Sequence, residues 1–133
     1  MKIGETKDAI VHSIEFWNHT NIELKKGNTY SISVDPKDQK WTDGKWIKEV
    51  CNAEGFSHRI LDIFSFLKRY KSAKWFCLIG CIDKSPEDFF KIGIIKENYT
   101  PTKTGILNCF ANDAKGHYKN NSGSISIKVK RIK

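Results

Sequence analysis

The C-terminal segment alternates between apolar and polar residues, and this period constrains the fold more than any other feature of the chain. Ile125, Ile127 and Val129 are separated by serine or lysine. Successive side chains of a β-strand point to opposite faces of its sheet, so the pattern predicts a strand with one buried face. Similar patterns predict further strands around Ile22 and Leu24, around Tyr30, Ile32 and Val34, around Phe90, Ile92 and Ile94, and around Leu107, Cys109 and Ala111.

Two other segments have a different pattern. In residues 9–17 the apolar positions are Ile10, Ile14 and Phe16, which predicts a half-buried strand with these side chains directed inward. Residues 75–82 form a nearly continuous apolar run, as expected of a strand that is buried on both faces. Turn-forming residues lie between the segments, and residues 98–104 are interpreted as a polar connection.

One segment, residues 60–71, shows helical rather than alternating spacing. Ser57 is a candidate N-cap, and the last turn is basic, which suits the helix dipole. An amphipathic basic helix can bind a membrane or a partner. The apolar stripe of such a helix more often packs against the core, and that is the interpretation adopted for Ile60, Ile63, Phe64, Leu67 and Tyr70.

Several short strands with turn signals and one helix predict an all-β protein, an antiparallel β-sandwich with one short helix inserted. A chain of 133 residues suits a single domain, residues 1–133. No apolar run approaches the roughly 18–20 residues that span a bilayer, so no membrane span is expected. The N-terminus has no apolar h-region, which predicts a cytoplasmic product or one released without a secretory signal peptide. The four cysteines are expected to be free thiols.

The loop of residues 112–123 concentrates oxygen donors between two predicted strands. It contains Asp113, the amides of Asn112, Asn120 and Asn121, and two glycines. Calcium takes six to eight oxygen ligands, from carboxylates, amides and backbone carbonyls. The same residues also dominate ordinary hairpin loops for conformational reasons. Composition alone leaves both interpretations open.

The sequence ND-x-x-G-x-Y-x-NNSGS of residues 112–124, followed by alternating Ile125, Ile127 and Val129, resembles the C-terminal signature of the LecA-like (PA-IL) galactophilic lectins of bacteria. The resemblance covers most of the chain except roughly residues 35–74. It implies a jelly-roll-like, galactose-binding-domain-like sandwich. Looser matches lie in the opening strands and in the later half, at Trp17, Thr20, Ile22, Leu24, Gly27, Tyr30, Ile32, Leu78-Ile79-Gly80, Phe90, Ile92-Gly93, Gly105 and Leu107.

The resemblance implies a calcium site. Asp113, Asn120 and Asn121 fall where these lectins place side-chain ligands, and His117 falls where they offer a backbone carbonyl. They supply one more carbonyl from the loop after the third strand, here at about residues 41–44, and Asp43 is taken as that ligand. Two sugar hydroxyls complete the coordination shell of the metal.

The resemblance also implies residues that contact the sugar. Asp113 and Asn120 would hydrogen-bond the hydroxyls, and His117 replaces a smaller residue at a sugar-contacting position. His58 is the histidine nearest to the family's His-Pro-x-Gln loop, although it lacks the following proline. In the irregular region of residues 35–59, Trp41 and Trp46 either stack on a sugar or anchor the loop to the sandwich, and both alternatives stay open.

The function predicted from the sequence is calcium-dependent carbohydrate binding, with a galactose-like or anionic glycan as the partner and a homo-oligomer as a further expectation from the family. A net charge of +8 supports an alternative, a calcium-independent basic module for acidic ligands such as an anionic glycan, nucleic acid or a lipid surface. No RRM or KH motif appears, so no specific nucleic acid is expected. No GxSxG or HExxH motif appears, and the chain is not expected to be an enzyme.

Overall fold

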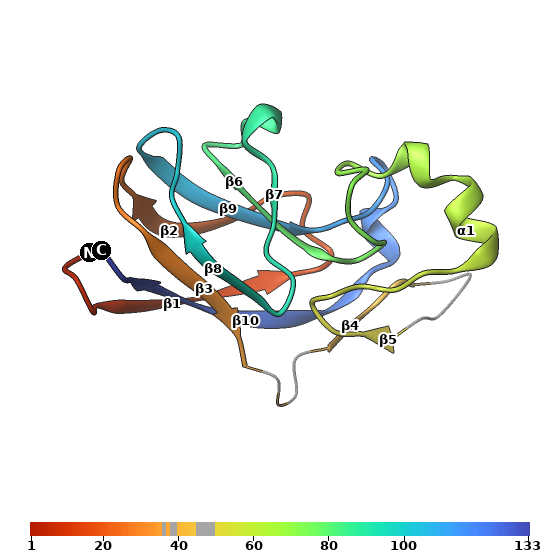
Figure 1. Ribbon diagram of the computed structural model, residues 1–133. Helices are drawn as coiled ribbons and strands as arrows, with labels where there is room; N and C mark the ends of the chain where they lie inside the picture. The colour runs from red at the N-terminus through yellow and green to blue at the C-terminus, as the bar shows by residue number, and fades with distance from the viewer. Residues whose placement is uncertain (36, 38–39, 45–49) are drawn as a thin grey trace.

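The structure is a computed structural model that describes residues 1–133 except 36, 38–39 and 45–49. In this part of the chain the strands form two antiparallel sheets (Figure 1). The first sheet has the order β5 (Val50–Cys51), β4 (Lys40–Thr42), β10 (Ser122–Arg131), β3 (Tyr30–Val34) and β8 (Ile95–Tyr99), with β1 (Thr6–His12) also paired to β10. The second has the order β2 (Asn18–Leu24), β9 (Gly105–Ala111), β6 (Leu78–Ile82) and β7 (Phe90–Lys91).

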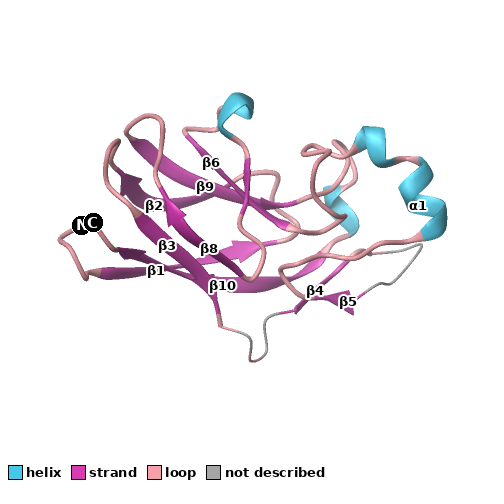
Figure 2. Ribbon diagram, viewed as in Figure 1, coloured by secondary structure: helices cyan, strands magenta, loops and turns pink. Residues whose placement is uncertain are grey.

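Helical structure is sparse among the described residues, as Figure 2 shows. It consists of α1 (Arg59–Ile63) and three short 3-10 helices, η1 (Ser65–Leu67), η2 (Pro86–Asp88) and η3 (Tyr118–Asn120). The predicted antiparallel β-sandwich with one short helix is therefore confirmed. None of these helices is both long and apolar enough to cross a membrane.

The strand β10 organises the first sheet. One edge of it pairs with β1 from Thr6 opposite Lys130 to His12 opposite Ser124. Its other edge pairs first with β4 and then with β3. The predicted alternation is present: Ile125, Ile127 and Val129 are fully buried, and they pack in one core with residues of both sheets.

The strand β6 is buried along its whole length because both of its faces are covered. Leu78 and Ile82 belong to the core between the sheets. Ile79 belongs to a second cluster, on the other face, which also contains Ala73, Cys77 and Phe110 and is flanked by Trp17, Tyr70 and Phe89. This arrangement confirms the prediction of a strand buried on both faces for residues 78–82, whereas residues 75–77 are buried but precede the strand.

The prediction for residues 9–17 was wrong in its register. In β1 the side chain of Val11 is fully buried, whereas Ile10 is 57% exposed, and the strand ends before Ile14 and Phe16. A shift of one residue moves every side chain of a strand to the other face. The segment holds apolar side chains at both parities, Ile10 and Val11, and pairing with β10 decides which one faces the core.

The helix is shorter than predicted, and of its predicted apolar stripe only Tyr70 packs against a buried cluster. The cap of α1 is His58 rather than Ser57: His58 Nδ1 accepts a hydrogen bond from the Ile60 backbone N–H at 3.2 Å. Residues 65–67 continue as the 3-10 turn η1, and the chain after it is extended. Among the residues of the predicted stripe, Ile60, Ile63, Phe64 and Leu67 are all exposed.

Two other details differ from the sequence-based expectations. The strand predicted around Phe90, Ile92 and Ile94 stops at Lys91. The polar connection predicted for residues 98–104 begins too early, because residues 98 and 99 form the end of β8. The four cysteines are all described and none is in a disulfide, as predicted. Trp46, for which stacking on a sugar or anchoring of the loop was predicted, lies outside the described residues.

Candidate functional site

The pairing of β4 with β10 brings two distant segments of the chain together. Thr42 lies opposite Ser122 in the antiparallel ladder, so the residues just after Thr42 lie beside the residues just before Ser122. The two segments are in close contact: a Cβ atom on Gly44 would lie within 2.6 Å of the Asn120 backbone carbonyl carbon. Asp43 thereby joins Asp113, Asn120 and Asn121 at one end of the sandwich.

Asp113 is almost completely buried and is held by short hydrogen bonds. It is 5% exposed. One carboxylate oxygen, Oδ1, accepts from the Ala114 backbone N–H at 2.7 Å, and the other, Oδ2, accepts from Asn121 Nδ2 at 3.0 Å. Lys and Arg side chains are the usual partners of a buried carboxylate. Among the described residues only neutral donors hydrogen-bond it, so its negative charge is not neutralised by these contacts.

Two buried amide oxygens near this carboxylate have no hydrogen-bond partner among the described residues. They are Asn120 Oδ1 and Asn121 Oδ1. The Asn121 amide nitrogen donates to Asp113 Oδ2 and to the Ser13 carbonyl, so the orientation of its oxygen is fixed by these two bonds. A buried polar atom without a partner costs about 1–3 kcal/mol. Such atoms in a native fold call for a ligand, an ion or water.

The carboxylates border a pocket of about 310 Å³. Asp43, Asp113, His117 and Asn120 supply its polar side chains, and no Lys or Arg is among the described residues that line it. Its remaining walls are Leu61, Phe64, Leu67, Trp75 and Ala114. The part of this pocket that carries the two carboxylates and the amide oxygen is suited to hold a cation.

The donor chemistry indicates which cations fit. No group of three or more His, Cys, Asp and Glu side chains in the described part of the chain is placed to hold a metal ion. The site instead combines two carboxylates with two amide oxygens. Hard cations such as calcium and magnesium take oxygen ligands of this kind, whereas zinc prefers nitrogen and sulfur.

Burial raises the pKa of Asp113 to about 6, although the hydrogen bonds from Asn121 and Ala114 oppose this shift. Burial also raises the pKa of Asp43, and the nearby His117 partly offsets that effect. Both pKa values are raised for the same reason: burial removes water from each carboxylate, and the surrounding groups stabilise the ionised form less than that water did. A bound cation would supply that compensation and favour the ionised forms.

This shift predicts the pH dependence of the metal-free protein. The pKa of Asp113 is higher in the folded state than its ordinary value of 3.8, so protonation favours folding. The stabilisation is fully present below about pH 4 and is lost as the pH rises through about 6. In EDTA, lowering the pH from 7 to 5 should raise the unfolding free energy of the wild type relative to that of Asp113→Asn by about 1 kcal/mol.

Urea unfolding of both proteins at the two pH values measures this difference. The comparison with Asp113→Asn removes the contributions of other groups, such as Glu54 and Asp88, whose pKa values are lowered by their lysine partners. Identical pH dependence in the two proteins would contradict the account of Asp113.

Other residues that the sequence analysis selected have structural roles. The Trp41 side chain is fully buried and its Nε1 donates to the Phe76 carbonyl at 2.9 Å, so it anchors the loop and presents no face for stacking. His58 caps α1 and is not among the described residues that line the pocket. His117 is exposed at the pocket. Asn112, considered as an oxygen donor, is occupied by backbone groups of Tyr70, Ala73 and Lys74.

The sequence analysis missed the apolar walls of the pocket. Leu61, Phe64 and Leu67 come from the α1–η1 segment, which lies in the part of the chain that the family resemblance does not cover. The available signal was the amphipathic pattern of residues 60–71. It predicted a core-facing stripe, whereas Phe64 and Leu67 border the pocket and remain partly exposed to water.

Comparison with known proteins gives one informative result. No protein-family model matches the sequence, and no curated protein matches it significantly. Among solved structures, the fold is similar to a chain described as "EclA N-terminal domain; PllA-like lectin", with a TM-score of 0.69 over 93% of this chain and 94% of that chain. The two sequences are 20% identical, so the similarity establishes a shared fold.

Proposed function

We propose that this protein binds carbohydrate through a calcium ion held by Asp43, Asp113, Asn120 and Asn121, with Asp43 supplying its carboxylate rather than the backbone carbonyl that the family resemblance implies. The observation that carries the proposal is the pair of buried amide oxygens on Asn120 and Asn121 that have no hydrogen-bond partner among the described residues. They lie beside Asp43 and Asp113, which form no salt bridge with a described residue. A divalent cation would balance the two negative charges and give both amide oxygens a partner.

Calcium suits this set of donors. It accepts six to eight oxygen ligands in flexible geometry, whereas magnesium requires near-ideal octahedral geometry. Four side chains alone do not complete such a shell. The family resemblance adds the His117 backbone carbonyl, and the open pocket leaves room for two hydroxyl groups of a ligand. The ion would supply a directional attachment point for vicinal hydroxyls, which hydrogen bonds in competition with water do not provide on their own.

A sugar is the ligand class that the surroundings support. A pocket of about 310 Å³ is of the size that takes a small molecule. It joins a polar end to apolar walls at Leu61, Phe64 and Leu67, as a ligand with hydroxyl groups and C–H faces requires. The structural neighbour is described as a lectin, and the loop of residues 112–124 resembles a lectin signature. A galactose-like sugar or an anionic glycan is the proposed partner.

Glycan-array screening with and without EDTA, followed by calorimetric titration of the best sugar, tests the proposal. Binding should require calcium and should weaken at least about 100-fold in Asp43→Asn, because loss of groups outside a metal's coordination shell already costs 10–100-fold. The matched control is Asp8→Asn, which changes an exposed aspartate on β1. Binding to acidic ligands that persists in EDTA and falls steeply with salt would favour the calcium-independent alternative instead.

A further inference from the structure

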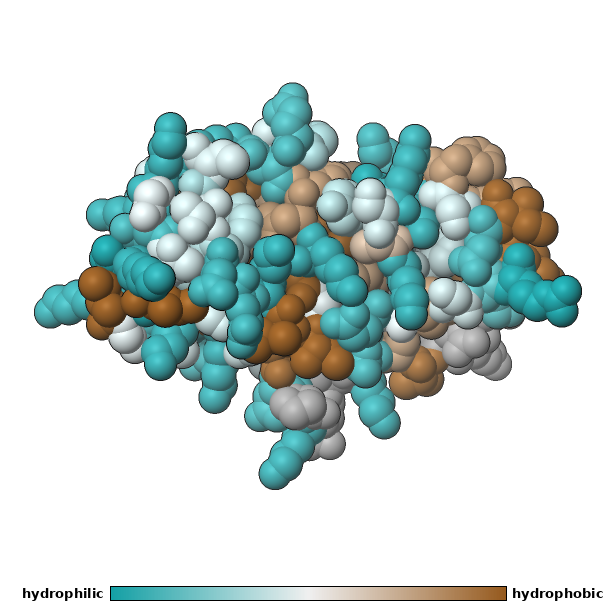
Figure 3. Space-filling view, in the orientation of Figure 1, coloured by the Kyte–Doolittle hydropathy of each residue, from teal (hydrophilic) through white to brown (hydrophobic). Residues whose placement is uncertain are grey.

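The α1–η1 segment exposes large apolar side chains that the fold does not use. Within residues 60–67, Ile60 is 63% exposed, Ile63 is 72% exposed and Phe66 is 63% exposed. Phe64 and Leu67 are also exposed, and Leu61 alone of the large apolar residues packs against the core. Figure 3 shows hydrophobic side chains gathered at the end of the molecule where α1 lies. Apolar side chains clustered on a surface mark an interaction site.

This segment is fixed to the sandwich rather than loosely attached. Lys68 forms a β-bridge with Ala114, and its Nζ donates to the Ala73 carbonyl at 2.7 Å. Arg69 donates through its backbone N–H to the Asp113 carbonyl and through Nη1 to the Phe16 carbonyl. Its guanidinium also lies 3.5 Å from the centre of the Phe110 ring. The apolar tip, defined as Ile60, Ile63, Phe64, Phe66 and Leu67, is therefore held on a structured base.

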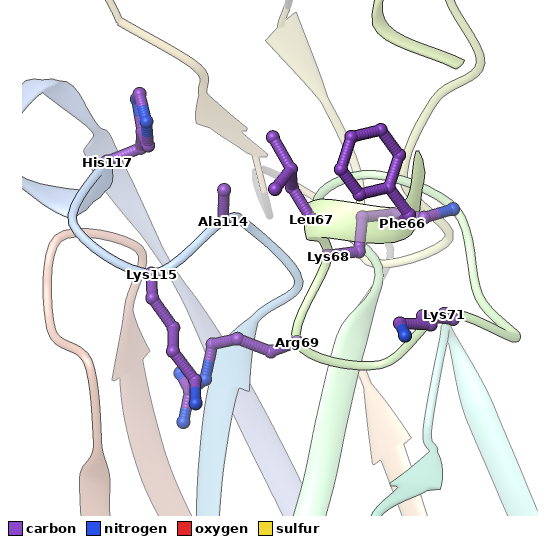
Figure 4. Close-up of a pocket in the computed structure, with 8 residues that line it drawn as sticks. All are labelled: Phe66, Leu67, Lys68, Arg69, Lys71, Ala114, Lys115 and His117. Atoms are coloured by element: carbon purple, nitrogen blue, oxygen red, sulfur yellow. The ribbon is translucent and has the colours of Figure 1, made fainter. Parts of the chain in front are cut away.

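Basic side chains border the apolar tip. A pocket of about 410 Å³ lies between η1 and the turn of residues 114–117 (Figure 4). Phe66 and Leu67 stand on one side of it, and Lys115 lies on the other with its side chain directed away from them. No acidic side chain is among the described residues that line this pocket, although α1 carries Asp62. The exposed cations of the pocket are Lys71 and Lys115, whereas Lys68 is buried and the guanidinium of Arg69 packs on aromatic rings.

We propose that the apolar tip and its basic border form a docking surface for bilayers that contain anionic phospholipids. Apolar side chains beside lysine and arginine are the combination that lies at a membrane interface, with the apolar groups below the headgroups and the cations beside the phosphates. Charge decides between this partner and a second copy of the chain. Two copies that met at this face would bring their basic borders together, whereas anionic headgroups complement them.

The docking surface lies at the opposite end of the sandwich from both termini (Figure 1). It also adjoins the candidate ion site, because Phe64 and Leu67 line the pocket that contains Asp43 and Asp113. When the protein lies on a bilayer through this surface, that pocket would lie at the level of the lipid headgroups. The inference depends on the apolar and basic residues alone and stands without the proposed sugar binding.

Flotation with sugar-free vesicles in EDTA tests the inference independently of calcium and carbohydrate. The full chain should bind phosphatidylcholine vesicles that contain phosphatidylglycerol and bind pure phosphatidylcholine vesicles much less. The double variant Ile63→Ser/Phe66→Ser should partition at least about ten-fold less, since each side chain loses the gain from apolar burial. The control Ile10→Ser/Ile95→Ser changes two exposed isoleucines on β1 and β8 and should bind as the wild type does.

A second pair of variants tests the charges. The double variant Lys71→Glu/Lys115→Glu should weaken binding at least about five-fold for each lysine. Its control, Lys128→Glu/Lys130→Glu on β10, gives the same change in net charge and should weaken binding less. Equal binding to both kinds of vesicle, or equal loss in the variants and their controls, would overturn the proposal. So would sedimentation velocity that shows a dimer of the wild type and a monomer of Ile63→Ser/Phe66→Ser, because the surface would then belong to a second copy.

Discussion

Calcium should raise the melting temperature of this protein by about 10 °C, and Asp113→Asn should lose most of that gain. A ligand bound only by the folded state stabilises it by about 2.7 kcal/mol at a concentration one hundred times its dissociation constant. For a domain of this size that free energy corresponds to a shift of about 10 °C. Asp113 is the most buried carboxylate of the site, so its charge should interact strongly with the ion. Scanning calorimetry in excess calcium and in EDTA measures both effects.

The controls for this experiment separate a site from a general salt effect. Asp8→Asn removes one exposed carboxylate on β1 and should keep the full calcium response. Magnesium at the same concentration should stabilise less, because it demands near-ideal octahedral geometry and gives up its own waters reluctantly, whereas calcium accepts a flexible set of carboxylate and amide oxygens. An equal response to calcium in the wild type and in Asp113→Asn would show that the ion binds elsewhere.

Asn112→Ala should lower the unfolding free energy by about 3 kcal/mol and the melting temperature by about 10 °C. The Asn112 side chain is fully buried, and its Oδ1 accepts from the Tyr70 backbone N–H at 3.0 Å. Its Nδ2 lies 2.8 Å from the Tyr70 carbonyl, 3.2 Å from the Ala73 carbonyl and 3.0 Å from the Lys74 carbonyl. Alanine would leave the Tyr70 N–H without its acceptor and would remove one donor from each of the three carbonyls, and lost hydrogen bonds of buried groups are costly.

Asn108→Ala is the matched control for that prediction. Asn108 is on β9, the strand that ends just before Asn112, and is also buried, but among the described residues its side chain makes one hydrogen bond, from Nδ2 to the Ile106 carbonyl. Its Oδ1 has no partner among the described residues. The variant should therefore lose only about 1 kcal/mol. Thermal unfolding of both variants in EDTA decides the matter, and equal losses would show that Asn112 does not hold residues 70–74 in place.

The sequence predicts the buried face of those strands in which the apolar residues occupy every second position. Ile125, Ile127 and Val129 in β10 and Ile32 and Val34 in β3 alternate with polar residues, so only one face of each strand can be buried. β1 could not be oriented in this way, because Ile10 and Val11 present apolar side chains to both faces. Pairing with β10 decides between them, and that information lies more than one hundred residues away in the sequence.

The helix shows a different limit. The spacing of Ile60, Ile63 and Phe64 correctly indicated a helix, but spacing alone does not say whether an apolar stripe faces a core or water. The core of this protein is already filled by the two sheets, and only Leu61 of α1 reaches it. Burial of a stripe depends on tertiary structure, which residues 60–67 do not encode locally.

The candidate site was partly visible in the sequence. Asp113, Asn120 and Asn121 lie within one loop, and their composition and the family resemblance both selected them. Asp43 is about seventy residues away, and the pairing of Thr42 with Ser122 is what brings it to them. The sequence could not show whether Trp41 is buried as an anchor or exposed for stacking on a sugar, because a tryptophan in an irregular segment suits either role. In the structure its side chain is buried.

A crystal structure grown with calcium and the best-binding sugar is the most direct test of the account. The account predicts one calcium ion at about 2.3–2.6 Å from oxygens of Asp113, Asn120 and Asn121, with Asp43 contributing from the side of β4 and two sugar hydroxyls completing the shell. A sugar bound away from this pocket, or Asn120 Oδ1 and Asn121 Oδ1 directed away from any ion in excess calcium, would contradict it.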